Sequence, residues 1–144
     1  MTPVDIIEIT EAADQKDAFA IRQMVFCEEQ QVDSDLEFDG LDDDCRQYLA
    51  RWNGLATGTA RIRDTGNGGV KIERVAVLAS HRNKGIGKAL MLRTMEDARA
   101  KGAVTIAINA QCHAEVFYRA LGFNRIGDIF DEADIPHVRM ELES

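Results

Sequence analysis

The sequence contains few of the residues that build metal centres or disulfide frameworks. Only three of its 144 residues are cysteine and three are histidine. The cysteines are Cys27, Cys45 and Cys112. They are odd in number and widely spaced, without a C-x-x-C pair, which predicts reduced thiols in a cytoplasmic protein. The histidines are too scattered to indicate a zinc site, so we expect no bound metal.

Long apolar runs and an excess of basic charge are also absent. No stretch approaches the roughly 18 apolar residues of a membrane-spanning helix, and residues 1–10 lack the features of a secretory signal. With 17 Lys and Arg against 25 Asp and Glu, the formal net charge is −8. This balance disfavours a nucleic-acid binder held by general electrostatics. We therefore expect a cytoplasmic protein with neither a membrane nor a nucleic-acid partner.

The acidity comes from one segment. Nine acids and no Lys or Arg occur between Glu28 and Asp44, which leaves 16 acids against 17 bases elsewhere. Residues 35–40 read D-x-E-x-D-G and imitate the start of a calcium-binding EF-hand loop. The twelfth position, where that loop needs a bidentate glutamate, holds Arg46, so calcium binding is excluded. A solvated acidic loop is one interpretation of this segment.

The length and the apolar pattern predict one α/β domain over residues 1–144. A domain of this size can bury enough surface to fold without a disulfide or a structural metal. Strands are predicted at residues 6–9, 47–52, 55–63, 70–78, 104–108, 123–126 and 137–142. Helices are predicted at residues 17–30, 85–101 and 114–121, and an acidic loop at residues 128–134. This order predicts a mixed sheet with helices on its faces.

Short polar signals mark the turns and caps between these elements. Asn53-Gly54 is a two-residue hairpin signal, and the glycine-rich stretch 66–69 marks a second hairpin turn. Asp14 or Asp17 can cap the first helix. The three central strands therefore form a meander.

Residues 82–87, R-N-K-G-I-G, carry the strongest chemical signal. They lie between a predicted strand and a predicted helix, where glycines let several backbone N–H groups point in one direction beside the positive end of the helix. A pyrophosphate suits such a cradle. The segment is not a P-loop, because Arg82 replaces its first glycine and Ala89 its hydroxyl residue. It is not a Rossmann fingerprint, because Leu90 replaces the third glycine.

The R/Q-x-x-G-x-G/A pattern after the strand 73–77 resembles the acetyl-CoA signature of the GNAT N-acetyltransferase superfamily. Residues 109–111 (N-A-Q) and 117–123 (F-Y-R-A-L-G-F) resemble a later segment of that family, and the predicted element order matches its fold. Residues 21–30 and 135–138 are similar to the small bacterial ElaA-like subgroup. The resemblance implies a mixed, mostly antiparallel sheet in which a splayed strand pair holds CoA.

The resemblance also implies how acetyl-CoA is held. Backbone groups of one strand would pair with the pantetheine arm, and backbone N–H groups of the following loop would hold the pyrophosphate. The strand residues are Val75, Ala76 and Val77, and the loop residues are Arg82, Asn83, Lys84, Gly85, Ile86, Gly87 and Lys88. Asn109 would touch the pantetheine or the adenosine side of the cleft.

Catalytic roles follow from the same resemblance. Tyr118 would protonate the departing thiolate, although it also suits an aromatic core beside Phe117 and Phe123. Glu73, expected on the same strand face as Val75, would act as base, directly or through water. It could instead pair with a neighbouring arginine such as Arg74. Glu28, Glu29 and His137 are further base candidates.

The acceptor is expected to be a primary amine whose identity the sequence does not reveal. Acceptor-site candidates are Phe26, Glu29, Gln30 and His137. In the family, the segment after the first helix borders the acceptor, so the acidic stretch is either a wall that attracts a cationic amine or the solvated loop considered above. An N-acetyltransferase is predicted. The alternative is a CoA-binding regulatory or interaction module without turnover, and a homodimer would be common in the family.

Overall fold

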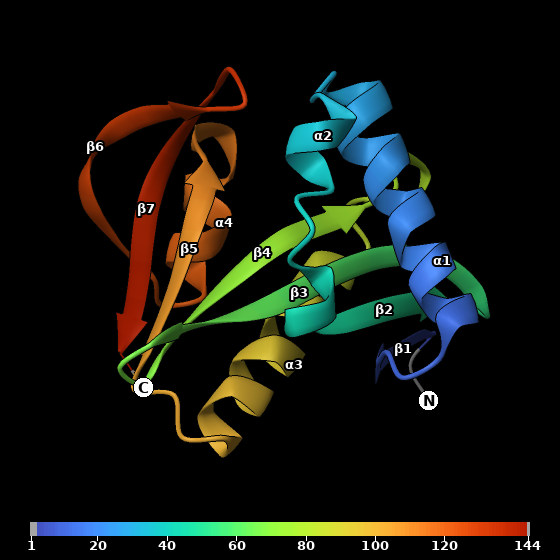
Figure 1. The fold of residues 1–144 in the computed structure, drawn as a ribbon, viewed down its shortest axis with the longest axis horizontal. Coiled ribbons are helices and arrows are strands. Elements are labelled where there is room, and N and C mark those ends of the chain that lie inside the picture. Colours follow the sequence, from blue (N-terminus) through green and yellow to red (C-terminus); the bar gives the residue numbers. More distant parts are fainter. Residues whose placement is uncertain (1–2, 144) are drawn as a thin grey trace.

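A seven-stranded sheet organises residues 3–143, which the computed structural model describes (Figure 1). The strands are β1 (Val4–Glu8), β2 (Arg46–Trp52), β3 (Leu55–Gly66), β4 (Gly69–Val77), β5 (Thr105–Gln111), β6 (Asn124–Glu132) and β7 (Ile135–Glu143). Their spatial order is β1-β2-β3-β4-β5-β7-β6. Only β4 and β5 pair in parallel. The predicted mixed, mostly antiparallel sheet is confirmed.

Helices cover both faces of this sheet (Figure 1). The α-helices are α1 (Ala12–Arg22), α2 (Ser34–Glu37), α3 (Ile86–Ala100) and α4 (Glu115–Ala120). A π-helical turn, Gln23–Glu29, continues α1, and 3₁₀ turns occur at Asp42–Asp44, Ala79–His81 and Cys112–Ala114. On one face α1 packs against the sheet in a small apolar cluster, and on the other face α3 packs in a larger one.

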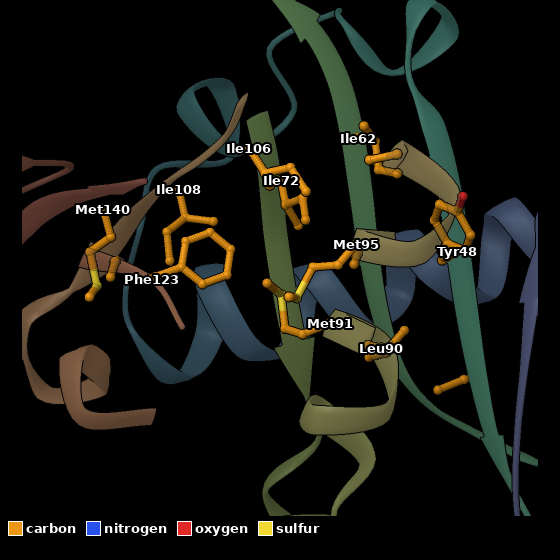
Figure 2. Close-up of a cluster of buried hydrophobic side chains, with 14 of the residues drawn as sticks. Tyr48, Ile62, Ile72, Leu90, Met91, Met95, Ile106, Ile108, Phe123 and Met140 are labelled. Carbon is orange, nitrogen blue, oxygen red and sulfur yellow. The ribbon is translucent and has the colours of Figure 1, made fainter. Parts of the chain in front are cut away.

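The larger cluster forms where α3 lies on the sheet (Figure 2). Leu90, Met91 and Met95 recur at helical spacing, so they share the buried face of α3. They pack with Ile72 of β4 and Ile106 of β5, among other strand residues. This packing fixes the beginning of α3 beside the end of β4.

Both predicted hairpin turns are confirmed, because their central residues adopt left-handed backbone conformations. Asn53 and Gly54 have φ of 48° and 86°, and Trp52 pairs with Leu55. The second turn likewise places two left-handed residues, at positions 67 and 68, between β3 and β4. Such residues favour the two-residue turns whose twist matches that of the strands.

The first helix departs from its prediction. It begins at Ala12 rather than at residue 17, and its last part is the π-helical turn, closed by a hydrogen bond from the Gln30 N–H to the Val25 carbonyl. Neither predicted aspartate caps it; Asp14 instead binds Arg51 of β2, with Nη2 2.7 Å from Oδ1. A π turn often marks a functional site, and apolar periodicity does not reveal one.

The predicted acidic loop at residues 128–134 is wrong, because most of it belongs to β6. The strand continues to Glu132 and turns through Ala133 and Asp134, whose φ values are 52° and 61°. This turn geometry is usually provided by Asn-Gly or Asp-Gly. Because Ala-Asp is not a typical dipeptide for this turn, the sequence did not predict the long hairpin of β6 and β7.

A β-bulge interrupts β4 at Arg74. Ala76 pairs with Thr59 and Glu73 pairs with Arg61, so two residues of β4 stand opposite one residue of β3. Arg74 has φ of 58°, in the left-handed region. The extra residue reverses the alternation of side chains along β4. The expectation that Glu73 and Val75 share one face of the strand is therefore wrong. Val75 packs towards the larger cluster, whereas Glu73 joins Arg61 on the α1 side.

The predicted splay between the two parallel strands is present. Residues 69–71 of β4 pair with residues 105–107 of β5, and the pairing goes no further within the described chain. From that point β4 and β5 diverge (Figure 1). Backbone groups of Val75–Val77 that face β5 therefore lack a strand partner.

Candidate active site

A cleft with a volume of about 840 Å³ opens between the diverging strands. It brings together most of the residues predicted from the sequence. The predicted residues that line it are Phe26, Glu29, Gln30, Glu73, Val75, Ala76, Val77, Arg82, Asn109, Tyr118 and His137. Residues 83–88 do not line this cleft and instead form the neighbouring loop and the beginning of α3.

The loop before α3 has the backbone geometry of an anion cradle. Asn83 and Gly85 have φ of 65° and 82°, and α3 begins directly after them. Left-handed residues alternating with ordinary ones direct successive N–H groups to one side, and the first turn of the helix adds unpaired N–H groups. Ile86 turns its side chain into the core, with 1% exposed, so it can offer only its backbone. This loop therefore has the backbone geometry of an anion-binding site.

Arg82 connects this loop to the π-helical turn on the other side of the cleft. Its Nε donates to the Val77 carbonyl at 3.0 Å, and its Nη1 and Nη2 donate to the Glu29 carboxylate at 2.6 and 2.7 Å. The hydrogen bond from Arg82 lowers the pKa of Glu29. The Glu29 carboxylate is therefore already occupied by a cation.

Tyr118 combines the two roles considered from the sequence. Its ring makes edge contacts with Phe117 and Phe123, at centroid distances of 5.0 and 6.2 Å. The residue also lines the cleft, and its hydroxyl makes no hydrogen bond with residues 3–143. Burial raises the pKa of Tyr118 to about 12, so the phenol is protonated at neutral pH. Aromatic packing thus holds an available proton donor in the cleft.

Glu73 is surrounded by basic side chains. Its Oε1 accepts hydrogen bonds from Arg61 Nη2 and Arg63 Nε, both at 3.0 Å, and Lys71 Nζ lies 3.4 Å from Oε2. Burial alone would raise the pKa of Glu73, but the hydrogen bond from Arg63 and the charges of Arg61 and Lys71 lower it to about 2. These contacts favour an ion-pair role over proton abstraction.

This lowered pKa predicts a loss of stability in acid. Glu73 binds protons less readily in the folded chain than in the unfolded chain, whose ordinary value is 4.5. Its contribution, about 3 kcal/mol, is present above pH 5 and disappears as pH falls towards 2. Urea titrations from pH 7 to 2.5 check this, with the exposed Glu96→Gln variant as control. A Glu73→Gln variant with the wild-type pH slope would contradict it.

The acidic segment lines one side of the cleft, and three of its acids are bound to arginines. Glu37 and Asp42 are buried, and both bind Arg22 of α1, with Nε 2.8 Å from Glu37 Oε2 and Nη1 2.6 Å from Asp42 Oδ1. Asp39 binds Arg61 of β3 at 2.8 Å. The expected concentrated negative patch is therefore partly neutralised, because each of these acids meets an arginine that lies far away in the sequence.

The same acidic segment also stabilises the β-bulge of β4 through hydrogen bonds. Arg74 donates from Nε to the Glu37 carbonyl at 3.2 Å and from Nη2 to Asp39 Oδ2 at 3.2 Å. The hydrogen bond from Arg61 lowers the pKa of Asp39 well below its usual range, so this partner stays charged. The acids from α2 onwards thus stabilise the left-handed Arg74 next to the unpaired backbone of Val75–Val77.

The wall formed by β5 and the β6–β7 hairpin contains polar residues that were not named as site candidates from the sequence, namely Gln111, His113 and Glu132. Gln111 exchanges amide hydrogen bonds with Gln30 at 3.1 and 2.8 Å, which links β5 to the π-helical turn. Asn109 Nδ2 donates to Glu132 Oε1 at 3.1 Å. No signal pointed to Glu132, because its hairpin was interpreted as a loop.

The described residues offer neither a metal centre nor a membrane-spanning helix. Residues 3–143 contain no group of three or more His, Cys, Asp or Glu side chains arranged to hold a metal ion. No helix in the same range has both the length and the apolar character needed to cross a bilayer.

Comparisons with known proteins agree with this geometry. A splayed, mostly antiparallel sheet with a glycine-containing loop before α3 is a feature that this chain shares with solved N-acyltransferase structures. The family model described as an acetyltransferase (GNAT) domain matches residues 11–144. The chain belongs to the GNAT acetyltransferase family and is an acyltransferase, as the motifs predicted.

Individual relatives cover most of the chain. The uncharacterised N-acetyltransferase YjcF of Bacillus subtilis is 35% identical over 130 residues, which is 87% of this chain and 89% of YjcF. ElaA of Escherichia coli is 32% identical over 127 residues, 85% of this chain and 83% of ElaA. The crystal structure of ElaA superimposes with a TM-score of 0.84 at 27% identity, covering 99% and 100% of the two chains. The predicted ElaA-like character is confirmed.

A second solved structure also shares the fold. The acyl-CoA N-acyltransferase of Pseudomonas aeruginosa superimposes with a TM-score of 0.84 at 28% identity, covering 96% of this chain and 98% of its own.

Proposed function

We propose that residues 1–144 act as one N-acetyltransferase domain that transfers the acetyl group of acetyl-CoA to a primary amine. The observation that carries this proposal is the cleft between β4 and β5, which has an anion-binding loop at its side and a protonated tyrosine in its wall. The family supplies the transferase class, and the name of the Pseudomonas relative supplies the acyl-CoA donor.

The donor would lie along the edge of β4. The edge of Val75–Val77 that faces β5 has no strand partner, so the pantetheine arm could pair there in the manner of an added strand once Arg82 releases the Val77 carbonyl. The N–H groups of residues 82–88 would hold the pyrophosphate, with Arg82, Lys84 and Lys88 adding positive charge. The unpaired edge and the loop lie at successive points of the chain, so a single extended donor can reach both.

The reaction would proceed by direct attack in a ternary complex. The amine, once deprotonated, attacks the thioester carbonyl, so a C–N bond forms and the C–S bond breaks. A backbone N–H of residues 75–77 stabilises the oxyanion. Tyr118 donates its phenolic proton to the departing sulfur. Glu73 and Glu29 are poor candidates for the base, because arginines occupy both carboxylates.

A thiol-release assay tests this proposal. Acetyl-CoA is incubated with the protein and with pooled alkylamines, aminosugars, polyamines and peptides, and free thiol is measured. We expect amine-dependent thiol release above the rate without protein. CoA binding with no thiol release for any amine would contradict turnover and favour a CoA-binding regulatory module.

A further inference from the structure

Two hydrogen-bond acceptors converge in the wall of the cleft, on the hairpin of β6 and β7. His137 is buried, with 6% of its surface exposed, and its Nδ1 lies 2.6 Å from the Ile135 carbonyl. A carbonyl oxygen only accepts hydrogen bonds, so Nδ1 carries the hydrogen. The neutral ring therefore has an unprotonated Nε2, and the contact with the Ile135 carbonyl fixes this tautomer.

The unprotonated nitrogen faces a carboxylate. His137 Nε2 lies 3.6 Å from Glu132 Oε2, while Glu132 Oε1 accepts the Asn109 amide. The imidazole also stacks on Phe130, with ring centroids 6.0 Å apart, which restricts its rotation. With a neutral imidazole, two acceptors face each other with no donor between them. A cationic N–H donor would satisfy both.

Glu132 also differs from the other acids of the cleft. Glu29, Glu37, Asp39 and Glu73 each bind an arginine. Within residues 3–143, Glu132 has no Lys or Arg partner, so its charge is available to a ligand.

We propose that Glu132 and His137 form the acceptor-ammonium site and that His137 Nε2 is the general base. This inference rests on the proposed acetyltransferase function. The ammonium donates to Glu132 Oε2 and to His137 Nε2, and one N–H bond then breaks as its proton moves to Nε2. The freed nitrogen lone pair attacks the thioester. The resulting imidazolium remains paired with the Glu132 carboxylate, which stabilises it.

Two amines separate a base from a structural residue. Butylamine is an ammonium at pH 7.5 and needs deprotonation, whereas methoxyamine is already neutral. For His137→Asn, whose amide can still donate to the Ile135 carbonyl, we expect kcat/KM for butylamine to fall roughly 10²–10³-fold and that for methoxyamine to change far less. His81→Asn, on the turn after β4, serves as control. Equal losses for both amines, or no loss, would overturn the base role.

Glu132→Gln tests the carboxylate separately. It should raise the KM for butylamine about tenfold or more and leave the KM for methoxyamine nearly unchanged. An unchanged KM for butylamine would remove Glu132 from the acceptor site.

The tautomer can be measured without turnover. Nitrogen-15 NMR of the free protein, with His137→Asn used for assignment, should show the neutral ring of His137 protonated at Nδ1 and unprotonated at Nε2. Protonation at Nε2 in the neutral ring would overturn the inference while leaving acetyl transfer intact. A wild-type protein that released no thiol with any amine would instead overturn the acetyltransferase function, and the base role with it.

Discussion

Replacing Arg22 with methionine should lower the free energy of unfolding by about 3–5 kcal/mol. Arg22 has 2% of its side chain exposed and binds Glu37 Oε2, the Glu37 carbonyl and Asp42 Oδ1. Its guanidinium carbon also lies over the rings of Phe19 and Phe38, at 5.1 and 4.8 Å from their centroids. Methionine fills much of the same volume, but it removes three charge-assisted hydrogen bonds. The cations that remain, Arg74 beside Glu37 and Arg61 beside Asp42, are already shared with other acids.

Urea unfolding at pH 7 measures this effect, and Arg139→Met is the matched control. Arg139 binds Glu141 at 2.8 Å, but 44% of its side chain is exposed. An exposed pair of this kind contributes about 0–1 kcal/mol. Equal losses from the two substitutions would show that burial does not set the strength of the Arg22 pairs. An m-value that changes in the Arg22 variant would point to a loosened α2 segment.

The Tyr118→Phe substitution should lower kcat roughly 10²–10³-fold with little change in stability. Phenylalanine keeps the edge contacts with Phe117 and Phe123 and loses only the hydroxyl that the cleft leaves without a partner. Because burial raises the pKa of Tyr118 to about 12, the wild-type rate should not depend on this group between pH 6 and 9.

The control is Tyr48→Phe, which removes another buried hydroxyl. The Tyr48 hydroxyl donates to Asp97 Oδ2 at 2.7 Å, away from the cleft. This variant should lose about 1–2 kcal/mol of stability and keep its kcat. If Tyr118→Phe retained full kcat across pH, the departing thiolate would receive its proton from another donor.

Local sequence signals predicted the parts of the molecule that depend on local chemistry. Asn53-Gly54 favours a two-residue turn at any place in a chain, and the glycine at 85 permits the left-handed residue before α3. The apolar spacing of residues 85–101 predicted the helix that the structure shows as α3. These signals were sufficient for the order of elements, and the family motifs named residues of which most line one cleft.

The remaining features depend on contacts between distant residues. The segment 28–44 looked like free negative charge because its arginine partners lie on α1, β3 and β4. The bulge at Arg74 has no glycine to signal it and is held by hydrogen bonds to α2. The turn at Ala133–Asp134 lacks a favourable dipeptide, so the position of Glu132 beside His137 could not be predicted.

The splay between β4 and β5 gives the protein a sheet edge in its interior as well as at β1 and β6. Unpaired strand edges attract other chains, and proteins usually shield them with charges, bulges or covering segments. Here the bulge at Arg74 and the salt bridge between Arg82 and Glu29 lie along that edge. A bound donor would complete the shielding, and a ligand at 100 times its Kd adds about 2.7 kcal/mol to the folded state. The concentration of acetyl-CoA would then govern the protein's resistance to aggregation as well as its rate.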